Sequence, residues 1–472
     1  MQKILFGEWL PDQPGVAGNV TDAKNCYPVA NGYASFPSEA DYSDAAGAEL
    51  LITFAGKFGG ATNLFAASAN QIYKFDSNDA TLNALTTTGY TTVDGWDVTQ
   101  FGGKMILANG QDKLQSYDIS LSTFVEDLAV AAPTAKFVTV VRDFVVAAND
   151  GTDTNKVYWS DINDETDWTP GAASQSDFQL IPDGGDITGL AGGEYGLIFL
   201  ERAIYRMSYS GSPFFFQFDA ISRSLGCISN GSIAQYGNLT YFLADDGFYV
   251  CDGQSIKSIG LEKVNRWFFE NAIPGEIPTA MSATVDPINK LVIWKFNGTF
   301  GGKFLLMYSI DLAKWSYAET TATSIAYALT PSATLEQVDN YNTSIDALDI
   351  PLDSRVFAGG QLLFAGVSGE KIISFSGQPK TATISTGDID VGRSVITLAK
   401  PIVDNGSANI AVASRDLLTE QVEFGTAIPA DAENRVSLRS NGDYHRLSLT
   451  PTGPSWKTAV GLEVDFVKQG NR

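Results

Sequence analysis

The chain is poor in the residues from which most enzymes build an active site. It has one histidine, His445, and three cysteines, Cys26, Cys227 and Cys251. Three cysteines make no disulfide framework, and no two of them have the short spacing of a zinc site. A Ser-His-Asp triad would depend on His445 alone, and we expect a packed or interfacial histidine instead. The sequence therefore predicts no catalytic residue, no metal and no cofactor.

Basic residues and long apolar runs are also scarce. Lys and Arg number 31 against 54 Asp and Glu, which gives a net charge of −23. Proteins that hold nucleic acid by its phosphates need clustered basic residues, so this balance argues against such a grip. It is compatible with a wall past which DNA slides, or with an acidic surface kept for solubility. No run reaches about 18 apolar residues, and the first residues lack the apolar stretch of a secretory signal. We therefore expect a soluble protein made in a cytoplasm, with no membrane span.

The sequence does contain a hairpin pattern, which occurs seven times. Each copy has a glycine or polar turn, a short apolar strand, a second turn and a strand that ends in an aromatic residue. The apolar strands are centred on Phe65, Ile106, Val145, Ile198, Phe242, Ile293 and Phe364. A period of about 40–50 residues is typical of a four-stranded propeller blade. Such blades stack face to face around a channel because one small sheet cannot bury both of its faces alone.

We predict an all-β protein with a β-propeller at residues 51–377. Six blades are expected, with seven as the alternative if every hairpin forms a blade. Residues 1–50 are predicted to form an extended strap that is suited to adding a strand to the last blade. A polar insertion near 333–360 predicts a projecting loop. Residues 378–472 predict a separate antiparallel β-module of about six strands, and the best helix signal is Gly260–Ala272.

Acidic residues gather in pairs, at Asp245–Asp246 and within Asp161–Glu165. A glycosidase needs two carboxylates that face each other roughly 5–10 Å apart, but Asp is also favoured in hairpin turns. We interpret these carboxylates as turn residues. The run Asn149–Asn155 (NDGTDTN) is acidic enough to hold a cation, but a solvated turn is the interpretation we prefer.

Aromatic residues are plentiful, and Phe214–Phe218 (FFFQF) is the densest run. In a strand, Phe214, Phe216 and Phe218 would share one face while Phe215 lies on the other, so both faces need cover. We expect core between blades, with a subunit or partner interface as the alternative.

Several segments resemble one protein family. They are KVYWSDINDETDWTP (Lys156–Pro170), the blade-like Phe178–Gly211 and Phe214–Gly253, the polar stretch Thr343–Gly360 and the ending Asp443–Arg472. In pattern they are similar to the tail nozzle proteins of short-tailed bacteriophages, also called tail hub or packaged-DNA stabilisation proteins. The likeness covers most of residues 156–472, and residues 1–155 match only in architecture.

The resemblance implies a non-enzymatic structural protein of the virion tail, assembled in the bacterial host cytoplasm. It implies a homohexameric ring below the portal and adaptor (head-to-tail connector) that retains packaged DNA and conducts it during ejection. Its partners would be the adaptor ring, tail fibre, tailspike or needle proteins, and viral DNA that passes without sequence-specific binding. Two alternatives stay open: a tailspike-like propeller that binds or degrades polysaccharide, and a scaffold propeller that binds a peptide.

A ring of this kind needs contacts between copies. A duplex needs a channel wider than about 20 Å, and the middle of one propeller is too narrow, so the DNA path would run between copies. The candidate contact residues in the terminal module are Arg435, Arg439, Tyr444, His445, Arg446, Trp456 and Lys457. Replacing Arg439 and Arg446 with Glu is expected to weaken assembly and to leave the propeller folded.

Overall fold

The computed structural model is built almost entirely of strands. It describes residues 1–15, 18–86, 89–90, 95–331, 360–453 and 455–469. Strands hold 56 % of the residues and helices 4 %, which confirms the all-β class. Within the described ranges, no helix is long and apolar enough to cross a membrane. The predicted polar insertion lies outside the described residues, except for Gly360 at its end.

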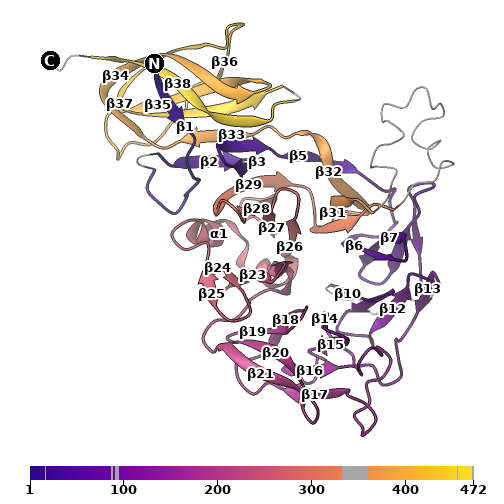
Figure 1. Cartoon of the computed structure of the whole chain (residues 1–472). Coiled ribbons are helices and arrows are strands. Elements are labelled where there is room, and N and C mark those ends of the chain that lie inside the picture. The colour runs from indigo at the N-terminus through magenta and orange to yellow at the C-terminus, as the bar shows by residue number, and fades with distance from the viewer. Residues whose placement is uncertain (16–17, 87–88, 91–94, 332–359, 454, 470–472) are drawn as a thin grey trace.

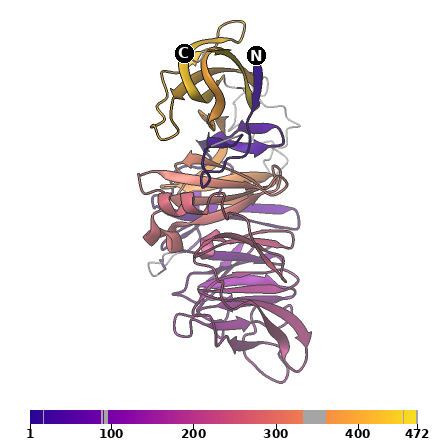
Figure 2. The same ribbon diagram turned by 90° about the vertical axis from the view of Figure 1, so that its left-hand side faces the viewer.

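Four-stranded blades form a β-propeller. Figure 1 shows it face-on, with the blades around the axis, and Figure 2 shows it from its edge. Six blades are separate sheets, and a further four-stranded group, β26–β29, lies at one end of a larger sheet. We number them blades 1 to 7 in chain order, with β26–β29 as blade 6. In that order their strands are β6–β9 (Leu50–Phe58, Ala61–Ser68, Ile72–Phe75, Leu82–Ala84), β10–β13 (Asp97–Phe101, Lys104–Ala108, Gln115–Asp118, Thr123–Val125), β14–β17 (Phe137–Val141, Phe144–Ala148, Lys156–Trp159, Asp177–Leu180), β18–β21 (Ile187–Ala191, Gly196–Leu200, Ile204–Gly211, Phe215–Ser222), β22–β25 (Ala234–Tyr236, Leu239–Ala244, Gly247–Cys251, Ile256–Ser258), β26–β29 (Ser282–Asp286, Leu291–Asn297, Lys303–Ser309, Lys314–Thr320), and β30–β32 with β5 (Ser324–Leu329, Leu362–Ser368, Lys371–Pro379, Pro37–Asp41).

Hydrophobic clusters between neighbouring blades close the ring. Phe199 of blade 4 and Phe242 of blade 5, for example, have ring centroids 5.1 Å apart. The last blade packs on the first, where Ala365 and Leu64 belong to one buried cluster. Each of the seven clusters joins strands of two adjacent blades. Six blades are separate sheets, which agrees with the predicted six blades. The four strands β26–β29, which belong to the larger sheet, add a seventh unit, as the alternative prediction allowed.

The apolar strand of every predicted hairpin is the second strand of a blade. These strands are β7, β11, β15, β19, β23, β27 and β31. Neighbouring blades cover both faces of such a strand, so β15 and β19 are buried at every position. The first strand of every blade contacts the first strand of an adjacent blade, and the first strands surround the central axis.

The N-terminal strap is shared between the propeller and the terminal module. Its β5 pairs antiparallel with β32 and supplies the fourth strand of blade 7. Glu39 of β5 also binds Lys380 at 2.8 Å, with both side chains largely buried. The other four strands, β1–β4 (Gln2–Leu5, Val20–Lys24, Cys26–Val29 and Gly32–Ser35), belong to the large sheet. One segment therefore closes the ring and anchors the module.

The terminal module extends the sheet of blade 6. Its strands are β33 (Thr383–Thr386), β34 (Ile389–Asp404), β35 (Ser407–Arg415), β36 (Ile428–Pro429), β37 (Val436–Thr452) and β38 (Thr458–Lys468). Strand β2 lies between β29 and β33 and meets β29 in parallel at Lys24 and Tyr317. Every other pair of named strands in the described ranges is antiparallel. The segments RVSLRSN and HRLSLTP both belong to the single long β37.

Two local predictions need correction. The predicted helix Gly260–Ala272 is shorter: α1 spans Asn265–Asn271, and Asp12 of the strap accepts the N–H groups of Arg266 and Trp267 at its start. The other helical turns are η1 (Asn230–Ser232), η2 (Pro274–Glu276) and α2 (Ile277–Ala280).

The phenylalanine run Phe214–Phe218 does not alternate as a plain strand would. Phe216 is buried between blades 3 and 4, and Phe218 packs against the same cluster. Phe214 is 79 % exposed. The backbone of Phe215 has φ +56°, and the pairing of β20 and β21 shifts register at this end. The change of backbone direction turns Phe214 outward.

Candidate functional site

The single histidine is an interior residue of the module. His445 is fully buried, and both ring nitrogens bind serine hydroxyls: Nε2 to Ser394 at 3.0 Å and Nδ1 to Ser414 at 2.6 Å. Burial lowers the pKa of His445, so the ring is neutral at pH 7. With both nitrogens occupied in this way, the ring cannot serve as a base that a carboxylate orients.

The predicted acidic pairs lie in turns of different blades. Asp245 and Asp246 form the exposed turn between β23 and β24, where Asp246 accepts a hydrogen bond from Tyr249 at 2.7 Å. In blade 3, Asp164 accepts the N–H and the hydroxyl of Thr166, a local hydrogen-bond pattern that is common in turns. These carboxylates therefore shape hairpins, and they come from blades 3 and 5.

The structure separates the predicted contact residues into buried and exposed groups. His445 and Trp456 are interior, with exposures of 0 and 2 %. Arg446 and Arg415 enclose the buried carboxylate of Asp388. Arg435 pairs with Asp431 and Glu433, and Tyr444 is half-buried beside the Asp388 cluster. Arg439 and Lys457 are the exposed members of the set. The seven residues therefore do not form one surface.

Side chains cross the central axis of the propeller. Asp97 of β10 accepts the N–H of Val138 at 2.9 Å and a hydrogen bond from the side chain of Asn230, in η1 before blade 5. Asn230 also lies against Gly189 of blade 4. Blades 2, 4 and 5 are not all neighbours, so these contacts span the central space. Protein encloses the half-buried Asp97, and burial raises its pKa to about 7.

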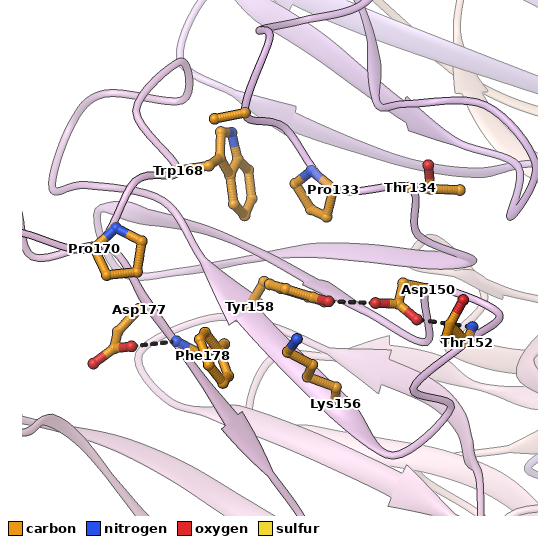
Figure 3. Close-up of a pocket in the computed structure, with 11 residues that line it drawn as sticks. Pro133, Thr134, Asp150, Thr152, Lys156, Tyr158, Trp168, Pro170, Asp177 and Phe178 are labelled. Atoms are coloured by element: carbon orange, nitrogen blue, oxygen red, sulfur yellow. Dashed lines mark hydrogen bonds between the residues drawn. The ribbon is translucent and has the colours of Figure 1, made fainter.

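A cavity in the described part of the chain lies between blade 3 and the connection that leads to it from blade 2. It has a volume of about 440 Å³. Its walls come from the connection before β14, the β15–β16 turn, β16 itself, the β16–β17 connection and β17 (Figure 3). The lining residues are Ala131, Pro133, Thr134, Asp150, Thr152, Lys156, Tyr158, Trp168, Pro170, Asp177 and Phe178. Three aromatic rings, two prolines and several polar groups thus converge on one space.

Charged side chains in fixed positions line the polar side of this cavity. Tyr158 donates its hydroxyl to Asp150, which also accepts the N–H groups of Thr152 and Asp153. Burial opposes ionisation of Asp150, but these hydrogen bonds prevail and lower its pKa. The Lys156 ammonium lies 4.7 Å from the ring centre of Tyr158, and its interaction with the Tyr158 hydroxyl raises the pKa of Lys156. Asp150 and Lys156 are therefore both charged at pH 7.

Comparisons with known proteins give limited information. No protein-family model and no curated protein matches the chain. Among solved structures, it is similar to the one titled "Crystal structure of RRP9 WD40 repeats". That match has a TM-score of 0.40 and 10 % sequence identity, and it covers 62 % of this chain and 89 % of that one. The likeness concerns the propeller fold and carries no functional argument.

The cavity was not predicted as a site, although the sequence held a partial signal. The acidic run Asn149–Asn155 has the composition of a cation loop, although a solvated turn is the preferred interpretation, and its Asp150 and Thr152 line the cavity. Within the described ranges, no three ligating side chains gather as a metal site would require. Trp168 and Pro133 reach the cavity from other connections, which one sequence does not place together.

Proposed function

We propose that this protein is a non-enzymatic structural subunit of a short-tailed phage tail, the nozzle or hub. In this role, copies form a sixfold ring below the adaptor, and the ring retains packaged DNA and conducts it during ejection. The sequence resemblance over residues 156–472 motivates the proposal.

The observation that carries it is the crossed axis of the propeller. Asp97 and Asn230 meet across the central space, and a duplex needs a path wider than about 20 Å. DNA would therefore pass beside the propeller and not through it. This supports a conduit that several copies build together, and closed cyclic symmetry is the usual arrangement for such assemblies.

The continuity of the propeller with the module also supports a structural role. Blade 6 continues through β2 into the module, and one hydrophobic cluster includes Trp294 of blade 6 and Leu449 of β37. A shared sheet and a shared core couple the two parts rigidly. A wall element that transmits force along a tail needs this rigidity.

The decisive test is the location of the chain in assembled particles. An antibody raised against the purified protein is expected to label the tail tip in electron micrographs of intact particles, and a reconstruction of that tip is expected to contain six copies. A chain that is absent from purified particles would contradict the proposal.

Arg439 and Lys457 offer a sharper test of the ring contact. Both are exposed on the module, so the double variant Arg439→Glu, Lys457→Glu is expected to fold normally and to enter fewer rings, as native mass spectrometry would show. The matched control is Arg202→Glu with Lys257→Glu, which changes two exposed basic residues of blades 4 and 5. Equal assembly by both double variants would rule out this contact surface.

A further inference from the structure

The cavity beside blade 3 combines apolar and polar walls. Trp168 is largely covered, with 8 % of its surface exposed. Phe178 lies on β17, the outermost strand of blade 3, and is 45 % exposed. Figure 3 shows Trp168 and Pro133 on one side of the space, with Lys156 and Phe178 on the other. Its volume of about 440 Å³ falls within the usual range of small-molecule pockets.

The charges in the cavity disfavour a charged ligand. The Lys156 ammonium lies 4.2 Å from the ring centre of Phe178 and also faces Tyr158. The cation site that these rings would otherwise offer is therefore taken. An anion would meet the carboxylates of Asp150 and Asp177, both of which line the space. A neutral ligand avoids both conflicts.

A neutral sugar ring has the matching chemistry. One face of a pyranose carries C–H groups that pack on aromatic rings and prolines, while its rim carries hydroxyls that donate and accept hydrogen bonds. Here Asp150 is held in place by Tyr158 and can accept from a hydroxyl. Lys156 can donate to one, and Thr134 and Thr152 line the same space.

We propose that this cavity binds a neutral hexose unit of a glycan. The proposal goes beyond the tail role and does not depend on it, because it concerns a cavity within one chain. A failure of ring assembly would leave it intact, and the absence of sugar binding would leave the tail role intact.

The test is a binding measurement on the full-length protein. The probes are methyl glycosides of glucose, galactose, mannose and N-acetylglucosamine with their short oligomers, followed by saturation-transfer NMR and tryptophan fluorescence. At least one probe is expected to bind. Phe178→Ala is expected to weaken that binding by about tenfold or more, the loss of one well-placed aromatic contact. Lys156→Met, which keeps the apolar stem, is expected to weaken it as well.

Phe214→Ala is the matched control, since Phe214 is an exposed phenylalanine in a turn of blade 4. It is expected to bind the sugar as the unchanged protein does, and melting curves would show that all variants fold. Absence of binding for every probe at about 10 mM would overturn the proposal, as would binding that Phe178→Ala leaves unchanged.

Discussion

The propeller and the terminal module bury their apolar residues in different ways. In the propeller, the core is divided among clusters that each join two neighbouring blades. The module instead shares one large cluster with blades 5 and 6. Repeated units that contact their neighbours add up roughly as a chain of local interactions, whereas a shared core links distant parts. The stability of the module should therefore depend on the rest of the molecule.

Among the variants proposed here, Trp294→Ala should cause the largest loss in the free energy of unfolding. Trp294 is fully buried, packs on Phe248 and Trp315, and donates its indole N–H to Ser232. Its removal is expected to cost about 3–5 kcal/mol of the free energy of unfolding. Because the cluster is shared, calorimetry is expected to show propeller and module melting together at a lower temperature. A module transition that keeps its own temperature would show that the two cores are independent.

Arg446→Glu is expected to act on the module almost as strongly. It removes one of two arginines that neutralise the buried Asp388 and adds a carboxylate beside it. Breaking such a pair costs about 3–5 kcal/mol. Arg439→Glu, on the same strand but exposed, is expected to stay within about 0.5 kcal/mol, as urea unfolding would show. Equal losses in the two variants would mean that the Asp388 cluster contributes little.

This contrast also changes the assembly experiment that the sequence suggested. The double variant at Arg439 and Arg446 would damage the module core, so poor assembly would not report on a contact surface. Lys457 replaces Arg446 for that reason.

The smallest of the three expected effects on the free energy of unfolding comes from Asp97, which lies at the propeller axis. Its pKa rises from 3.8 to about 7 on folding, chiefly because of burial. The folded chain therefore holds a proton that the unfolded chain loses between these pH values, so the free energy of unfolding falls as pH rises through this range. A pKa difference of this size corresponds to at most about 4 kcal/mol, and because Asp97 is partly exposed, screening by solvent brings the expected loss to about 2 kcal/mol. Denaturant titrations from pH 4 to 8 are expected to show it in the unchanged chain and not in Asp97→Asn. Parallel pH curves for the two proteins would refute this.

The sequence predicted the propeller because its second strands are covered on both faces and so appear as apolar runs, as at Val145 and Phe242. The outermost strands carry no such signal: β17 is exposed at all four positions. The sequence predicted a strap that adds a strand to the last blade, as β5 does. It did not predict β1–β4, since the partner of β1, for example, lies hundreds of residues away. The contact candidates could not be sorted either, since Arg439 and Arg446 look alike in sequence and only pairing with Asp388 distinguishes them.

The pairing of β5 with β32 sets the order of events during synthesis. Asp41 and Lys371, which form an ion pair across this junction, are 330 residues apart. At ribosomal rates of 5–20 residues per second, roughly 20 to 60 seconds separate their appearance. Throughout that interval blade 1 has no blade 7 to cover the apolar face around Leu64. Nascent chains of this protein should therefore be most sensitive to aggregation and to chaperone supply just before blade 7 leaves the ribosome, and least sensitive once it has closed on β5.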